Sequence, residues 1–255
     1  MSLTSDFDYV ASVSHDLKSP LNAIIGFVEL IKTGILAHDA EDGAPLEVLE
    51  DLKMVENLSK DMLALISNML TAARIQAGKQ PMMPTVITKQ ELLERASMLE
   101  RTFQAEAKSR NIDFAVSVGA LPRYVYWDIQ QIRNFAVNNL ISNALKFVGE
   151  DGIVRVYIDT NDKDIVSILV ADNGPGVPEQ ERAAIFEKFA QSSGNAWSHT
   201  GSGYGLYNAV RVVHAHKGRL EILDGLENKG ATFAMTLPAV PFEICGDLLR
   251  AAQAA

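Results

Sequence analysis

The segment Ile165-Val166-Ser167-Ile168-Leu169-Val170-Ala171-Asp172-Asn173-Gly174-Pro175-Gly176 joins an apolar run to a turn. The run predicts a strand over 165–171, and alternating residues over 153–159 predict a neighbouring strand. Asp172 stands where the strand ends, and the glycines that follow allow the backbone to approach a flat ring. A carboxylate in that position can accept a hydrogen bond from an adenine amino group. A plain surface turn is the alternative, because Asn-Gly and Pro-Gly are turn dipeptides.

A helix is predicted before these strands, over 128–147, with Asp128 as its N-cap. Asn139, Asn143 and Lys146 are spaced i, i+4 and i+7 on this helix, so they share one face. Neutral amide oxygens suit a Mg²⁺ ion that already carries phosphates, and Lys146 can meet phosphate charge. Taken alone, these side chains fit a solvated polar face better, by roughly two to one.

After the strands, Gly201-Ser202-Gly203-Tyr204-Gly205-Leu206 leads into a helix predicted over 205–215. Free amides and a helix N-terminus at one place form an anion site. The motif differs from the dinucleotide fingerprint, because its third glycine comes one residue early and no strand precedes it. A flexible linker is the alternative. The preceding residues 190–202 contain no Lys or Arg and are predicted to form a mobile cover over the site.

The segments around these motifs complete one layered domain. A helix is predicted over 90–108, a strand over 112–118, and a closing hairpin over 219–223 and 231–237. Such an order predicts a mixed sheet with helices on one face.

Residues before position 80 carry a different pattern, an apolar heptad seam in two runs. The first run is Leu3, Phe7, Val10, Leu17, Leu21, Ile24, Val28, Ile31 and Ile35, and the second is Val48, Val55, Leu58, Met62, Leu65, Met69 and Ala72. Two long helices joined by a loop at 37–44 make an antiparallel hairpin. A lone hairpin buries too little apolar surface to be stable, so a four-helix bundle in a homodimer is expected.

Pro81 and Pro84 mark a domain boundary near residue 80. The predicted organisation is a helical hairpin over 1–80, a second domain over 81–240 and a C-terminal tail over 241–255 without an assigned function. The predicted fold class is therefore α+β.

The first predicted helix contains Ser14-His15-Asp16-Leu17-Lys18-Ser19-Pro20. His15 lies one position off the seam, so its ring should face solvent, as an ordinary surface histidine would. Asp16 can orient the imidazole and leave the other ring nitrogen free as a nucleophile. Pro20 inside a helix costs about 3 kcal/mol, which fits a helix that bends beside a reactive residue better than a plain scaffold.

The composition excludes several classes of protein. Of 255 residues, 47% are hydrophobic and 22% are charged, as in an ordinary globular protein. The net charge of −9, without a cluster of Lys or Arg, argues against nucleic acid and membrane surfaces as partners. No window is apolar enough to span a membrane. A single cysteine, Cys245, indicates a reducing compartment. We expect a cytoplasmic segment, either free or the cytoplasmic part of a longer membrane-bound sensor.

In their order along the chain, these motifs resemble the H, N, G1, F and G2 boxes of two-component sensor histidine kinases. The F box corresponds to Phe186-Glu187-Lys188-Phe189. The resemblance spans residues 5 to 238. It implies a dimeric phospho-acceptor hairpin joined to an α/β sandwich ATP-binding domain of the Bergerat type, found in the GHKL proteins.

The resemblance also implies a role for each matching residue. His15 would be the phospho-acceptor with Asp16 as its acidic neighbour, and Asn143 would coordinate Mg²⁺. The ATP pocket would be formed by Asn139, Asn143, Lys146, Phe147, Asp172, Gly174, Gly176, Gly203, Tyr204, Gly205 and Leu206. The implied activity is autophosphorylation of His15 from Mg·ATP. Transfer to an aspartate of a response-regulator receiver domain would follow.

Three departures from the family pattern accompany the resemblance. Asp16 replaces the more common Glu, Ser19 replaces the Thr or Asn of many members with phosphatase activity, and the cover lacks a basic residue for the γ-phosphate. Lys188 or His199 could supply that contact. A gyrase-like or chaperone-like ATPase is one alternative function, and a degenerate scaffold that binds a receiver is another.

Overall fold

The structure is a computed structural model. It describes residues 81–187, 204–226 and 229–240, together with positions 21, 22, 24–26, 28, 29, 31, 52–56, 59, 62, 63, 66, 67 and 70. The chain separates into two compact units, Met1–Gln80 and Pro81–Ala255. Each unit is described by itself.

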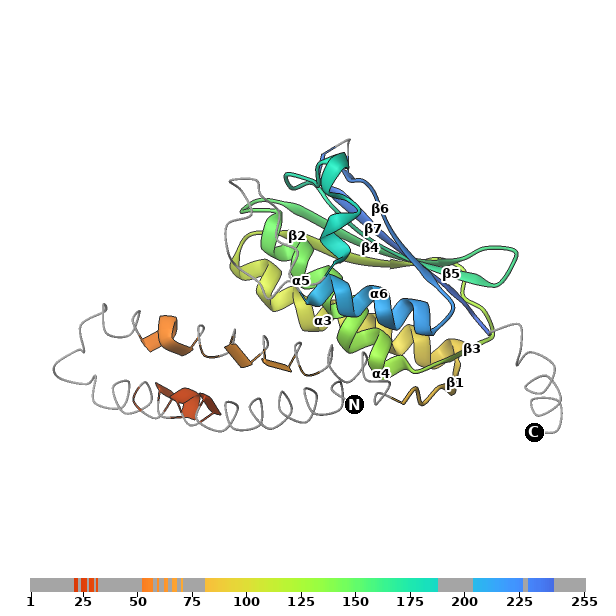
Figure 1. Ribbon diagram of the computed structural model, residues 1–255, viewed down its shortest axis with the longest axis horizontal. Helices are drawn as coiled ribbons and strands as arrows, with labels where there is room; N and C mark the ends of the chain where they lie inside the picture. The colour runs from red at the N-terminus through yellow and green to blue at the C-terminus, as the bar shows by residue number, and fades with distance from the viewer. Residues whose placement is uncertain are drawn as a thin grey trace, which may run out of the picture. The chain divides into compact units, whose positions relative to one another are not determined.

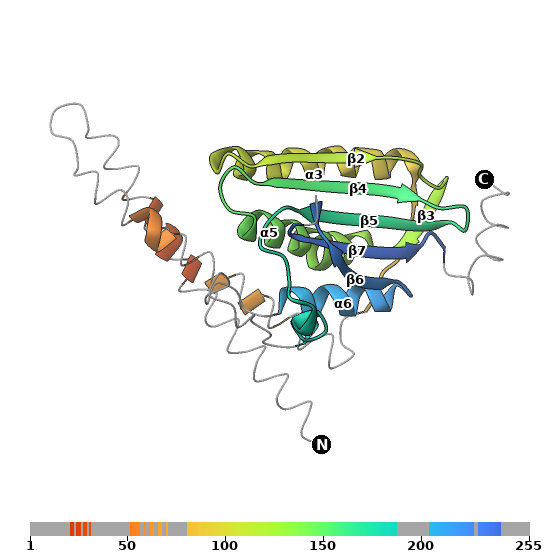
Figure 2. The ribbon, with the colours of Figure 1, turned by 90° about the horizontal axis from the view of Figure 1, so that it is seen from above.

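A five-stranded sheet forms the frame of the second unit (Figure 2). Its strands, in order across the sheet, are β2 (Asp113–Val118), β4 (Ile153–Thr160), β5 (Ile165–Asp172), β7 (Ala231–Pro238) and β6 (Arg219–Asp224). β2 pairs with β4 in parallel, and all other neighbours are antiparallel. The predicted mixed sheet and the α+β fold class are confirmed, and Asp172 is the last residue of its central strand β5.

Two short strands were missed by the sequence prediction. β1 (Thr85–Thr88) and β3 (Tyr124–Trp127) form a separate antiparallel pair, in which Thr85 lies opposite Trp127. Each strand has only four residues, and its partner lies far away along the chain, so no local alternation reveals the pair.

The long helices cover one face of the sheet (Figure 1). They are α3 (Lys89–Ser109), the helical stretch from Ile129 to Phe147, and α6 (Gly205–Ala215). α3 begins with a capping box, in which Thr88 and Glu91 bond each other's backbone N–H groups. Two short 3₁₀ turns, η2 (Glu179–Glu181) and η3 (Ala184–Phe186), follow β5.

A single helix was predicted over 128–147, but the stretch from Ile129 to Phe147 is not a uniform α-helix. It consists of α4 (Ile129–Gln131), a π-helical segment η1 (Ile132–Val137) and α5 (Asn138–Phe147). The backbone N–H of Asn138 donates to the carbonyl of Arg133, five residues earlier. Such π segments are rare and frequently stand next to functional sites.

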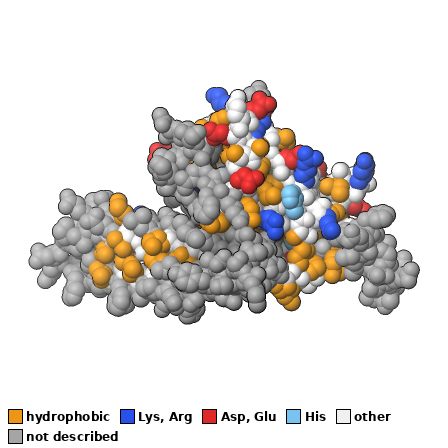
Figure 3. All heavy atoms as spheres, viewed as in Figure 1, with side chains coloured by type: hydrophobic (Ala, Val, Ile, Leu, Met, Phe, Trp, Pro, Cys, Tyr) orange, Lys and Arg blue, Asp and Glu red, His pale blue; other side chains and the backbone are white. Residues whose placement is uncertain are grey.

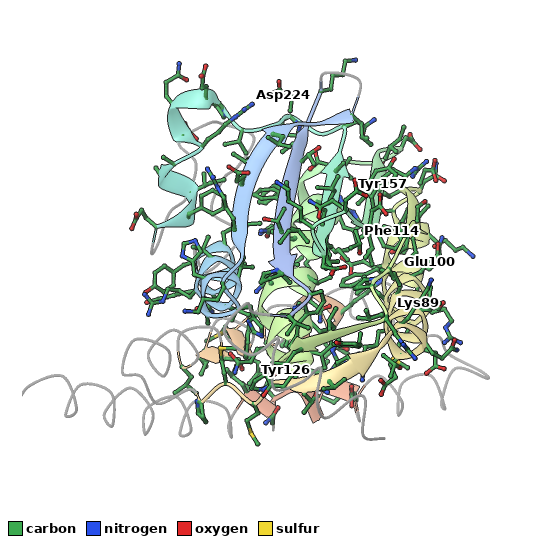
Figure 4. All side chains as sticks on the ribbon, turned by 90° about the vertical axis from the view of Figure 1, so that its right-hand side faces the viewer. Lys89, Glu100, Phe114, Tyr126, Tyr157 and Asp224 are labelled. Carbon is green, nitrogen blue, oxygen red and sulfur yellow. The ribbon has the colours of Figure 1, made fainter. Side chains whose placement is uncertain are left out.

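Packing between sheet and helices is apolar on the inside. Phe103 of α3 and Phe114 of β2 have ring centroids 6.3 Å apart, and the Glu100 carboxylate accepts a hydrogen bond from Val116 N at 3.2 Å. Phe114 and Glu100 can be located in Figure 4. The outer face of α6 instead carries exposed Arg211 and His214, exposed Lys217 follows the end of the helix, and basic side chains gather there in Figure 3.

His216 caps the other end of α6 and ties it to the start of α4. Its ring Nε2 accepts a hydrogen bond from Asp128 N at 3.0 Å, so the ring proton must be on Nδ1, which lies 2.8 Å from Val212 O. The Asp128 carboxylate caps α4 through Gln131 N and also accepts from Met83 N. Residues 81–83 are thereby joined to the ends of two helices.

The pH dependence of folding should report this histidine. Burial lowers the pKa of His216 below 6.5, although the Val212 carbonyl and Asp128 oppose that shift. As pH falls below 6.5, the unfolded chain takes up a proton that the folded chain refuses, so the unfolding free energy should decrease. In urea denaturation, the unfolding free energy of His216→Gln should decrease less than that of the wild type as pH falls from 6.5 to the folded-state pKa of His216. Exposed His214→Gln is the matched control, and equal slopes for all three proteins would contradict the expectation.

In the first unit, Leu21 and Val28 of the first predicted run are buried as expected, whereas the second run packs through a different stripe. Leu21, Ile66 and Leu70 form a buried cluster with Leu63 packed against it. Glu56 and Ser59 are also buried, whereas seam residues Ile24, Ile31, Val55 and Met62 are exposed. The buried stripe of the second run therefore lies one residue along from the predicted one. Among the described residues, no helix is both long and apolar enough to cross a membrane.

Candidate functional site

Asp172 has a buried carboxylate whose two oxygens face different surroundings. The residue is 5% exposed, and its Oδ1 accepts hydrogen bonds from Gly174 N at 2.9 Å and Ala231 N at 3.2 Å. No described residue donates a hydrogen bond to Oδ2. Burial raises the pKa of this carboxyl, and the two backbone N–H groups partly offset the increase. Oδ2 is thus an acceptor left for a ligand.

The turn after Asp172 is fixed on two sides. A methyl group placed on Gly174 would lie 3.1 Å from the carbonyl oxygen of Phe147, so the turn packs closely against the end of α5. Asn173 bonds the neighbouring strand, because its Oδ1 accepts from Ile153 N at 2.7 Å. The turn therefore holds Asp172 in place and brings it to the helix that carries the predicted amide face.

A second loop, between β6 and β7, supports Asp172 and was not predicted as part of the site. Carbon atoms added at Gly225 and Gly230 would lie 2.4 and 2.1 Å from the Asp172 carbonyl oxygen. Gly230 and Gly176 both have positive φ, and a carbon added at Gly176 would lie 2.7 Å from Gly230 O. The sequence contained a signal, since Gly225 and Gly230 are five positions apart, but this spacing equally fits an ordinary hairpin turn.

Replacing Gly230 by Ala should test this support. The added methyl group meets both an unfavourable positive φ and the Asp172 backbone, so we expect a loss of unfolding free energy of about 3 kcal/mol. Gly149→Ala is the matched control, because Gly149 also has positive φ but has nothing within 4 Å of the added carbon. It should lose only about 1 kcal/mol. Equal losses in denaturant titrations would contradict close packing at Gly230.

The predicted polar face of α5 lies beside the start of α6. Its residues Asn139, Asn143 and Lys146 are all partly buried, and so is Phe147, which the resemblance adds to the pocket. The Asn139 amide nitrogen donates to Phe135 O at 2.7 Å, and a carbon added at Gly205 would lie 3.3 Å from Asn139 Oδ1. Lys146 Nζ lies 5.2 Å from the centroid of the Phe147 ring. Residues more than sixty positions apart in the sequence therefore meet here.

The N-terminus of α6 provides backbone donors at the same place. Gly205 and Leu206 are its first residues, and Tyr204 precedes them, with its carbonyl accepting from Asn208 N at 2.8 Å. Tyr204 is 8% exposed, and burial raises the pKa of its hydroxyl, which stays protonated at neutral pH. The first amides of a helix have no partner within the helix and favour an anion.

Several predicted site residues lie outside the described residues. These are His15, Asp16, Gly203, Lys188 and His199, together with the whole of the 190–202 cover. Among the residues that the structure does describe, no group of His, Cys, Asp or Glu is arranged to hold a metal ion. The described site thus consists of one carboxylate, a polar helix face and a helix N-terminus, which suits a ligand with a base and phosphates.

Comparison with known proteins agrees with this arrangement. Residues 130–241 match the family model "Histidine kinase-, DNA gyrase B-, and HSP90-like ATPase", and residues 8–78 match "His Kinase A (phospho-acceptor) domain". The signal transduction histidine-protein kinase/phosphatase MprB of Mycobacterium avium is 31% identical over 93% of this chain and 44% of its own length. Hybrid signal transduction histidine kinase D of Dictyostelium discoideum is 29% identical over 91% of this chain and 15% of its own length.

A solved structure extends the comparison to both units. Full-length ShkA in complex with AMPPNP has a TM-score of 0.68 and 27% identity, covering 91% of this chain and 45% of ShkA. The fold and the site define an ATPase-type domain of the histidine kinase, gyrase B and HSP90 class. The chain belongs to the two-component sensor histidine kinases and corresponds to their catalytic core. It spans less than half the length of these curated relatives.

Proposed function

We propose that this chain is an ATP-dependent protein-histidine kinase core, which phosphorylates itself on His15 and passes the phosphoryl group to an aspartate of a response-regulator receiver domain. One observation carries the nucleotide half of the proposal. The Asp172 side chain is buried, and among the described residues none donates a hydrogen bond to its Oδ2, which lies beside a turn that packs on the amide-bearing helix α5. A base that presents an amino group matches that oxygen.

The other ends of an ATP molecule match the neighbouring elements. We propose that Asp172 binds the adenine amino group, with Gly174 and Gly176 forming the wall beside the base. Tyr204, Gly205 and Leu206, with Gly203 before them, would meet the phosphates and ribose at the start of α6. Lys146 would supply positive charge and Phe147 would line the pocket, and the global charge of −9 makes such local groups necessary.

Magnesium fits the same helix face by the chemistry of its donors. Amide oxygens are hard neutral ligands, and Mg²⁺ commonly keeps water and substrate phosphate oxygens in its remaining positions. We propose that Asn143 is its protein ligand, with Asn139 lining the site nearby. When bound, the metal would neutralise charge that develops on the transferring phosphate.

The transfer itself needs little covalent chemistry from the protein. In the proposed step, an unprotonated ring nitrogen of His15 attacks the γ-phosphorus, the bond to the β–γ bridging oxygen breaks, and ADP leaves. Asp16 would orient the ring and accept the proton from its other nitrogen. A carboxylate oxygen of the receiver would then attack the same phosphorus, and His15 would leave.

Residues 1–80 would form the dimerisation and phosphotransfer hairpin, and residues 81–240 the ATP-binding domain. The exposed apolar side chains Ile24, Ile31, Val55 and Met62 support a homodimer, since a second copy would remove them from water. The proposed location is the cytoplasm, where ATP is available and a lone Cys245 stays reduced.

Labelling with ATP tests the proposal directly. The protein is incubated with Mg·ATP labelled at the γ-phosphate, separated from free nucleotide and treated with acid or base. We expect label on the protein that acid removes and base does not, and its transfer to a cognate receiver. Steady phosphate release without labelled protein would instead support an ATPase, and failure to bind ATP at millimolar Mg²⁺ would support a scaffold.

A further inference from the structure

A cavity of about 260 Å³ lies between α3, the start of the long helical stretch and the sheet. It shares no lining residue with the candidate nucleotide site. Its inner wall is apolar and is formed by buried side chains, which include Ala96, Leu99, Trp127, Ile132, Val137 and Ile168. Exposed residues of α3 and η1, among them Met98 and Arg133, stand at its mouth. The cavity is therefore an open apolar recess, distinct from the ATP pocket.

The polar groups of this recess are cationic or neutral. Arg95 and Arg133 line it, and the lining contains no Asp or Glu. Arg133 donates to the neutral amide oxygens of Gln130 and Asn134. Two guanidinium groups without a carboxylate between them are notable in a chain of net charge −9. The local charge therefore favours an anion.

Arg95 supplies a second, independent observation. Its Nε is buried and has no hydrogen-bond partner among the described residues. Glu91, an acidic residue one turn earlier on the same helix, accepts hydrogen bonds from the backbone N–H and the hydroxyl of Thr88, although its charge still acts on Arg95. A buried N–H donor without a partner is costly unless a ligand or water satisfies it. Among the described residues, Arg95 Nε thus lacks an acceptor at the wall of the apolar recess.

From these contacts we infer that the recess is a binding site for a small amphipathic carboxylic acid. The apolar body would occupy the space between Leu99, Trp127 and Val137. The carboxylate would pair with Arg95, because the planar guanidinium group presents N–H donors in a geometry that fits the two carboxylate oxygens. An apolar cavity of about 150 Å³ admits benzene, so this recess has room for a body of about eight carbon atoms. Neither Asp172 nor His15 takes part, so the site is independent of the proposed kinase activity.

The intrinsic fluorescence of Trp127 can test the inference without ATP. The chain has two tryptophans, so Trp197→Phe leaves Trp127, which lines the recess, as the reporter. We expect octanoate to change its emission saturably. Arg95→Gln should raise the dissociation constant about tenfold, because it removes the guanidinium cation that would pair with the carboxylate. Arg101→Gln, an exposed arginine on the same helix outside the recess, should leave it unchanged.

Two further measurements separate the carboxylate from general apolar binding. Met98→Glu adds a negative charge at the exposed mouth, so it should weaken octanoate binding and serves if Arg95→Gln fails to fold. The neutral analogue 1-octanol should be insensitive to both substitutions. No saturable change at millimolar octanoate, or equal affinities for octanoate in the wild type, Arg95→Gln and Met98→Glu, would overturn the inference. These outcomes are distinguishable from a failure of the proposed function, because ATP labelling is scored separately.

Discussion

His15→Ala should lose all acid-labile label from γ-labelled Mg·ATP, a decrease of at least about a thousandfold against the wild type. The imidazole is the proposed nucleophile, and an alanine side chain has no atom that can form a bond to phosphorus. The neighbouring Asp16 and Ser19 cannot replace it, since an aspartyl phosphate is base-labile and a serine phosphate is acid-stable. Quantified gel autoradiography after acid and base treatment measures the result.

The same variant should still bind nucleotide normally. All the proposed ATP contacts come from residues between Asn139 and Leu206, so the dissociation constant for ATP should stay within about twofold of the wild-type value. His38→Ala is a matched control, because it removes another histidine from the same predicted hairpin and should label fully. Equal labelling of the His15→Ala protein and the wild type would contradict the assignment, whatever the ATP affinity.

Local patterns predicted most of the second unit. The helix predicted over 205–215 coincides with α6, and the one predicted over 90–108 differs from α3 by one residue at each end. The predicted strands likewise match β2, β4, β5, β6 and β7 to within one residue at each end. These elements carry strong periodicity, because each buries one face against the same core.

The features that the sequence did not reveal depend on distant partners. β1 forms only because Tyr124–Trp127 provides its pairing edge, and the π turn in η1 leaves no trace in a pattern of period 3.6. In the hairpin, apolar residues occupy two stripes, so spacing alone could not decide which stripe faces the other helix. Burial of Ile66 and exposure of Met62 place the contact of the second run on the stripe that was not predicted, whereas Leu21 of the first run lies on the predicted one.

The residue types of the candidate site could be predicted from the sequence, but the hydrogen bonds and close contacts within the site could not. Asp172, Gly174 and the amide pair of α5 follow from order and spacing. By contrast, the separate tasks of the two Asp172 oxygens depend on Ala231 N, which the fold brings from 59 positions away. The contribution of Gly225 and Gly230 likewise appears only when their distances to the Asp172 backbone are known.

Asp172→Asn should weaken ATP binding about 100-fold while leaving the fold intact. Both backbone donors, Gly174 N and Ala231 N, bond Oδ1, and an asparagine keeps an oxygen in that position. Its amide nitrogen then replaces Oδ2 and presents a donor to the donor of the adenine amino group. The substitution therefore replaces the acceptor that would face the ligand by a donor, and it keeps the acceptor that bonds the protein backbone.

Calorimetric titration with ATP and urea denaturation, performed on the same preparations, separate the two effects. The unfolding free energy of Asp172→Asn should change by less than about 1 kcal/mol, since burial already disfavours the charge that is removed. Asp162→Asn, at an exposed turn between β4 and β5, is the charge-matched control and should change neither quantity. A guanine nucleotide should bind Asp172→Asn no more weakly than it binds the wild type, because it offers a carbonyl where adenine offers an amino group and the new amide donor can pair with that carbonyl. Wild-type ATP affinity in Asp172→Asn would mean that Oδ2 does not face the base, and the adenine pocket would have to be sought elsewhere on the helix side of the sheet.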